Sequence, residues 1–168
     1  MGFLRRLFGR EENDAPAAPQ GASLAERLAE VSAVITALND YYRAHATTGN
    51  EILVKVALTL SAYQLALTRV LSRPTLGEAE LWEVADHLSP SDAEQAAKIR
   101  AAAPLLNDML PRDRDKVRGD LLRELMTGVN TYADVGRQLL RVREWRAQGM
   151  SEAKINQLLS TWQVKNIL

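Results

Sequence analysis

The chain has 168 residues, no cysteine, two histidines, and 21 basic side chains balanced by 21 acidic ones. Without cysteine, disulfides, thiolate catalysis and Cys-rich zinc sites are excluded, and the composition fits a reducing, cytoplasmic compartment. The length allows one domain with a sizeable core, and the low aromatic content of 5% beside abundant Ala, Leu, Arg and Glu favours helices over strands.

Residues 1–10, MGFLRRLFGR, form a predicted amphipathic arm, because its apolar and basic side chains fall on opposite sides of a helical wheel. The apolar set is Phe3, Leu4, Leu7 and Phe8, and the basic set is Arg5, Arg6 and Arg10. An interfacial helix needs this separation, since apolar groups enter the acyl boundary while guanidinium groups meet lipid phosphates. The arm resembles the short amphipathic targeting sequences at the termini of many bacterial peripheral membrane proteins, which implies reversible binding to an anionic membrane surface.

Docking of the arm in a protein groove, on a partner or on the chain's own body, is an alternative, and so is an arm without structure. Arg at position 6 argues against N-myristoylation, and the short apolar run followed by two glutamates argues against a secretory signal. Residues 11–22 contain two prolines, a glycine and three acidic residues, which predicts a flexible linker. We therefore divide the chain into the arm (1–10), the linker (11–22) and a helical-bundle domain (23–168).

The domain opens with a predicted helix that ends near residues 47–49. Ser23 and Glu26 form the S-x-x-E pattern of a capping box at its start. Apolar residues then recur at alternating steps of four and three, which is a heptad seam. The seam consists of Leu24, Leu28, Val31, Ile35, Leu38, Tyr42 and His45. Because His45 lies on this seam, we expect it to be buried or in an interface.

Residues 51–72 are apolar almost all round, which predicts the central helix of a bundle with Asn50 as its cap. A transmembrane span is not expected. Lys55 and Arg69 confine the charge-free stretch to residues 56–68, whereas a bilayer requires roughly 20 residues.

Shorter helices are expected between residues 75 and 110. Thr75 with Glu78, and Ser91 with Glu94, match the capping-box pattern. Pro104 should either kink the second of these helices or divide it into 92–102 and 104–110. The best metal or catalytic candidates lie on the first, namely Glu80, Glu83, Asp86 and His87. The paired Glu-x-x-His pattern of carboxylate metal sites is absent, so we expect a solvated acidic face.

A long helical pattern runs from Pro111 to residues 148–149, and a last helix follows Ser151. Whether residues 112–148 form one helix or two is left open, because Gly119, Gly128 and Gly136 each weaken a helix and a break could fall at Gly128.

Residues 137–168 hold a Gly-x-Ser turn followed by apolar positions at helical spacing. The positions are Gly149, Ser151, Ala153, Ile155, Leu158, Leu159, Val164, Ile167 and Leu168. They resemble the helix-turn-helix of resolvases and transposases, with a second turn about two residues short. The resemblance implies DNA binding as an alternative function, with phosphate contacts and base contacts. The phosphate contacts would come from Arg137, Arg141, Arg143 and Arg146, and the base contacts from Gln163, Lys165 and Asn166.

These patterns together predict an all-α protein, a bundle of five to seven helices with a flexible N-terminal amphipathic arm. No nucleotide-binding or nucleophile motif occurs, so we expect no catalytic residue, metal or cofactor. Residues 23–110 hold seven basic against eleven acidic side chains, and residues 111–168 eleven against seven, so the chain is polarised. We expect a non-enzymatic interaction or scaffold protein, cytoplasmic or peripheral at the membrane, whose heptad seams would also serve a homo-oligomer.

Overall fold

The computed structural model describes residues 23–160, which form six α-helices and one 3-10 helix, with no strand in that range. In chain order these are α2 (Leu24–Ala44), α3 (Glu51–Leu71), α4 (Glu78–Leu88), α5 (Ala93–Ala102), η1 (Ala103–Asp108), α6 (Pro111–Ala147) and α7 (Glu152–Ser160). The predicted all-α class and helix number are confirmed. The arm, the linker and residues 161–168 lie outside the described residues.

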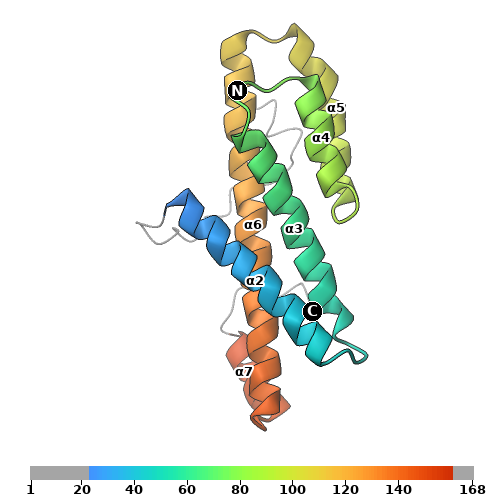
Figure 1. Cartoon of the computed structure of the whole chain (residues 1–168), viewed down its shortest axis with the longest axis vertical. Helices are drawn as coiled ribbons and strands as arrows, with labels where there is room; N and C mark the ends of the chain where they lie inside the picture. Colours follow the sequence, from blue (N-terminus) through green and yellow to red (C-terminus); the bar gives the residue numbers. More distant parts are fainter. Residues whose placement is uncertain (1–22, 161–168) are drawn as a thin grey trace.

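The long helix α6 runs along most of the molecule, with α3 at its side (Figure 1). Helix α2 crosses both α3 and α6, and the hairpin of α4 and α5 packs beside the C-terminal part of α3. Helix α7 folds back at the end of α6. Because α3 contacts α2, α4 and α6, the prediction that it is the central helix is confirmed.

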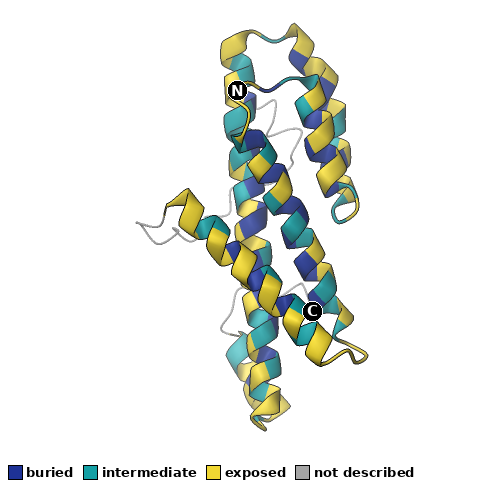
Figure 2. Ribbon diagram, viewed as in Figure 1, coloured by how far each residue is buried: buried dark blue, intermediate teal, exposed yellow. Residues whose placement is uncertain are grey.

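The core lies mainly between α3 and its neighbours, and the buried residues lie on the sides of the helices that face one another (Figure 2). On α3, Leu53, Leu60 and Leu67 are completely buried and recur every seven residues, so they form one line along the helix. Leu121 and Leu125 of α6 are buried in the same core. Each buried leucine stabilises the fold by roughly 1.5–3 kcal/mol relative to an exposed one.

Helix α2 begins as predicted, with a complete capping box. The Glu26 N–H donates to Ser23 Oγ at 3.2 Å, and the Ser23 N–H donates to the Glu26 carboxylate at 2.6 Å. The seam is buried only in its middle, at Val31 and Leu38. His45 was predicted to be buried or in an interface; it is not buried within the chain, because the helix ends at Ala44 and the His45 side chain is exposed at the C-cap position.

The caps of three other helices differ from the predicted ones. Asn50 precedes α3 without a side-chain cap bond, and α4 begins after Gly77, whose N–H donates to the Glu80 carboxylate at 3.0 Å. Asp92 caps α5 by accepting from the Gln95 N–H at 3.0 Å. The predicted boxes are therefore wrong by two positions at residue 75 and by one at residue 91. Asp92 supplies the acceptor expected of Ser91, whereas Gly77 has no side-chain acceptor and only its N–H is capped, by Glu80.

The helix is divided at Pro104: α5 ends at Ala102, and the proline lies in the first turn of η1. Helix α6 is a single helix of 37 residues, so the possible break at Gly128 does not occur. Gly149 ends the following turn with a φ of 79°, a left-handed conformation that favours glycine.

Candidate interaction surface

Two leucines on the outer face of α3 are exposed although the helix is central. Leu58 is 59% exposed and Leu65 is 56% exposed. Seven residues are close to two helical turns, so both side chains lie on one line about 10 Å apart along the axis. We call Leu58 and Leu65 the α3 stripe; Ala62, which lies between them along the helix, is 8% exposed and belongs to the core. These two leucines make the outer face of α3 the candidate surface for a contact.

Charged residues lie at both ends of the α3 stripe. Glu51 and Lys55 are exposed near its N-terminal end. Near its C-terminal end Arg69 forms an ion pair with Glu83 of α4, and the two side chains are 27% and 46% exposed. Each end of the stripe therefore carries one acidic and one basic side chain.

The sequence does not predict this surface, because the all-round apolar character of residues 51–72 indicates complete burial. The sequence nevertheless contains one indication of an open face. Three neighbouring helices cannot cover every side of a fourth one, so an all-round apolar helix in a small bundle leaves one face open. Among the described residues, α3 alone has the length and composition of a membrane span, but nine of its residues lie in the core.

The four arginines of the predicted phosphate-binding set do not form one surface. Arg137 lies 2.7 Å from Asp134 and 3.7 Å from Glu30, as distances between the charged atoms. Arg141 is exposed. Arg143 binds the turn between α2 and α3, and Arg146 binds Glu152 of α7.

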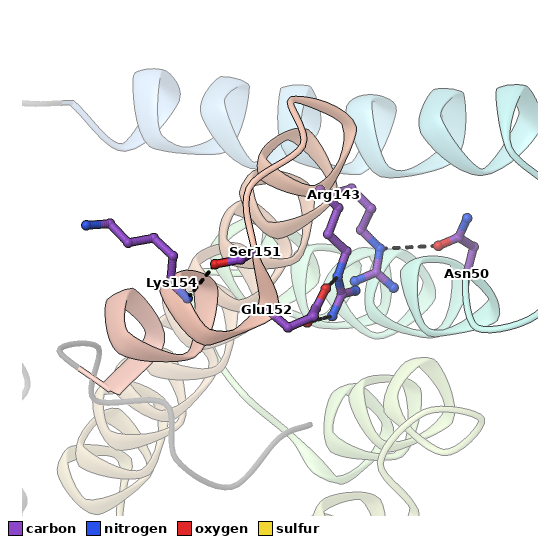
Figure 3. A network of polar contacts seen from close by, with 6 residues as sticks. Asn50, Arg143, Ser151, Glu152 and Lys154 are labelled. Atoms are coloured by element: carbon purple, nitrogen blue, oxygen red, sulfur yellow. Dashed lines mark hydrogen bonds and ion pairs between the residues drawn. The ribbon is translucent and has the colours of Figure 1, made fainter.

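Arg143 of α6 forms hydrogen bonds with the turn between α2 and α3 (Figure 3). Its Nε donates to Asn50 Oδ1 at 3.2 Å, and its Nη2 donates to the Gly49 carbonyl oxygen at 3.0 Å. Partial burial, with a smaller effect of the nearby charge of Arg146, lowers the pKa of the guanidinium from its ordinary value. These contacts give Arg143 a structural role, since two of its five N–H donors already have acceptors within the chain.

The turn between α6 and α7 is held by a second arginine. Arg146 donates two hydrogen bonds to the Glu152 carboxylate, at 2.7 and 3.0 Å. The side-chain hydrogen bond raises the pKa of Arg146 and lowers the pKa of Glu152. Ser151 opens α7 by accepting from the Lys154 N–H at 3.3 Å, and Figure 3 shows these two residues together. A helix, a Gly-x-Ser turn and a second helix thus occur as predicted.

The predicted base-contacting residues, Gln163, Lys165 and Asn166, lie outside the described residues, as do all seven candidate residues of the arm. Three of the four predicted phosphate-contacting arginines bind carboxylates or backbone and amide oxygens of the described part of the chain. Such partners compete with phosphates, so the described residues give the nucleic-acid interpretation no continuous basic surface.

The acidic helix α4 makes ion pairs with its neighbours. Glu83 pairs with Arg69, and Asp86 accepts from Arg100 at 2.7 Å. Glu80 caps the helix start, and His87 is exposed. In residues 23–160 no three His, Asp or Glu side chains are grouped so as to hold a metal ion.

Neither a protein-family model, nor a curated protein, nor a solved structure matches this chain significantly. Inference about its function therefore depends on its own residues.

Proposed function

We propose that this protein is a non-enzymatic helical interaction protein that residues 1–10 hold at an anionic membrane surface while the bundle presents a protein-binding face. The observation that carries the interaction role is the exposure of Leu58 and Leu65, each more than half accessible on a helix whose other sides are buried. Burial of such side chains is the main source of binding free energy in protein interfaces.

The composition of the arm supports the membrane tether. Burying Phe3, Leu4, Leu7 and Phe8 would contribute roughly 1.5–3 kcal/mol each. Arg5, Arg6 and Arg10 would each add about 1 kcal/mol near an anionic leaflet. Ordering a helix of this length offsets much of that sum, so binding is reversible. The linker of residues 11–22 separates the arm from the bundle, which begins at Ser23.

Co-sedimentation of the full chain with phosphatidylcholine vesicles, with and without phosphatidylglycerol, tests the tether. We expect the chain to pellet only with the anionic vesicles, and less as salt rises. The double variant Phe3→Glu and Phe8→Glu should stay in the supernatant. As a matched control, Leu105→Glu with Leu110→Glu changes two exposed leucines of the bundle, 41% and 57% accessible, and should pellet like the wild type. A wild-type chain that remains in the supernatant would disprove the membrane tether.

A further inference from the structure

We propose that α4, α5 and η1 open from the rest of the bundle as one piece, while α2, α3 and α6 stay packed together. We call residues 78–108 the α4–η1 unit; it lies beside the C-terminal part of α3 (Figure 1). Opening uncovers the buried faces of α3 and α4, so the bundle has a second state besides the closed one. The inference rests neither on the membrane tether nor on the exposed leucines of α3, so it can fail without them.

The α4–η1 unit is held together by its own contacts. Its three helices pack on one another, whereas α4 is the member that packs extensively on α3. Arg100 of α5 donates to the Asp86 carboxylate of α4 at 2.7 Å, and Asn107 of η1 donates to the Glu78 carboxylate of α4 at 2.6 Å. Because α5 and η1 are each bonded to α4, all three helices move together when α4 leaves α3.

The side of α3 that faces α4 buries little apolar area. Arg69 marks this side, because it forms an ion pair with Glu83 of α4. Ala62 and Ala66 lie seven and three residues before Arg69, so they are on the same side of the helix, and both are buried. The completely buried leucines of α3 lie on the opposite side. Since alanine buries less apolar area than leucine, separation from α4 costs α3 less free energy than separation on its leucine side.

The boundary also contains buried polar atoms without partners. Within residues 23–160, the two buried side-chain nitrogens that lack a hydrogen-bond partner are Arg69 Nε on α3 and Gln95 Nε2 on α5. Gln95 is 7% exposed and is the one polar side chain of these residues that is buried. It lies one turn after Asp92, whose carboxylate accepts from the Tyr63 hydroxyl of α3. Burial without a partner disfavours the closed state, and water in the open state removes that cost.

Arginines of α6 define the two hinges. Arg118 donates to the Arg73 carbonyl oxygen at 3.0 Å, so the end of α3 stays bound to α6 and the first hinge is the loop that follows. Arg114 donates to the carbonyl oxygens of Asn107 and Met109, at 3.3 and 3.2 Å. The second hinge therefore lies at the end of η1. Hinges of this kind are a few loop or helix-end residues whose backbone angles absorb the motion.

Hydrogen exchange of the full chain in urea concentrations below the unfolding transition tests the opening. We expect the amides of α4 and α5 to exchange through one common opening, faster than the amides of α3 and α6 and with a smaller urea dependence. The smaller dependence follows because opening exposes less surface than complete unfolding. Equal protection and equal urea dependence from α3 to α6 would overturn the proposal.

Two variants separate opening from complete unfolding. Gln95→Met replaces the buried amide with an apolar side chain of similar length, so exchange in α4 and α5 should become about ten-fold slower. Gly119→Ala is the matched control on α6, where a Cβ atom meets nothing within 4 Å. It strengthens a helix that stays folded on opening, so it should slow exchange in α3 and α6 by roughly two- to five-fold and leave α4 and α5 unchanged.

Each variant can contradict the proposal. If Gly119→Ala slows all helices equally, the chain unfolds only as a whole and the α4–η1 unit does not open by itself. If Gln95→Met leaves exchange in α4 and α5 unchanged or makes it faster, the buried amide does not favour opening.

Discussion

The ring of Tyr63 on α3 lies directly against the backbone of Gly128 on α6. A Cβ atom at Gly128 would lie 2.2 Å from Tyr63 Cε1, a separation that real side chains do not adopt. Tyr63 is 5% exposed, and its hydroxyl donates to Asp92 Oδ2 at 2.7 Å. Its ring centroid is 5.5 Å from that of Tyr132. The missing side chain of Gly128 therefore makes room for the residue that joins α3, α5 and α6.

Replacing this glycine should destabilise the bundle. We expect Gly128→Ala to lower the free energy of unfolding by about 1–3 kcal/mol, because the added methyl group must displace a buried ring. Urea denaturation followed by circular dichroism measures the change. Gly119→Ala is the matched control on the same helix, where a Cβ atom meets nothing within 4 Å. That control should stabilise the protein by roughly 0.5–1 kcal/mol, and equal stabilities for the two variants would contradict the packing argument.

The hydroxyl of Tyr63 should contribute separately from its ring. Tyr63→Phe removes the hydrogen bond to Asp92 and should lower the free energy of unfolding by about 1 kcal/mol. Because Asp92 still accepts from the Gln95 N–H, the start of α5 should remain helical. Tyr42→Phe, at a half-buried position on α2, is the control. Indistinguishable urea midpoints for the two variants would show that the hydroxyl contributes nothing.

The contacts of Arg143 should stabilise the turn between α2 and α3. Arg143→Met keeps an apolar stem but removes the bonds to Asn50 and Gly49, so we expect a loss of about 1–3 kcal/mol. Hydrogen exchange of the amides at residues 45–50 should also become faster. Arg141→Met, at an exposed position two residues earlier, should change stability by less than about 0.5 kcal/mol. Unchanged hydrogen exchange at residues 45–50 in Arg143→Met would argue against a stabilising role for the contacts of Arg143.

The Arg146–Glu152 pair should make stability depend on pH in the acidic range. The folded pKa of Glu152 is lower than its ordinary value, so the unfolded chain binds more protons in this range. The contribution of the pair is complete above the unfolded pKa and is lost as the pH falls through the folded one. Glu152→Gln should therefore lose less stability than the wild type between about pH 6 and pH 3. Arg146→Met should behave in the same way, and wild-type pH dependence in both variants would exclude the pair as a cause.

The helix pattern was predictable where the deciding contacts are local. The capping box at Ser23 involves residues three positions apart, so the sequence contains all of it. The continuity of α6 was not predictable in this way. Gly128 and Gly136 weaken an isolated helix, but here they allow Tyr63 and Leu38 to pack against it, and tertiary packing supplies most helix stability in proteins.

The candidate surfaces were predictable to a smaller extent. The arginines of residues 137–146 look like a basic group in the sequence, yet the amide oxygen that Arg143 binds lies 93 residues away from it. A local pattern cannot reveal such a partner. The exposure of Leu58 and Leu65 depends on how many helices surround α3, which is a property of the assembled bundle.

The unbroken length of α6 has a mechanical consequence. At a rise of 1.5 Å per residue, its 37 residues span about 55 Å. Helices α2 and α3 pack against its side, so α6 is a rigid helix of fixed length with η1 at one end and α7 at the other. The turn that leads into α7 is thereby held at a fixed separation from η1.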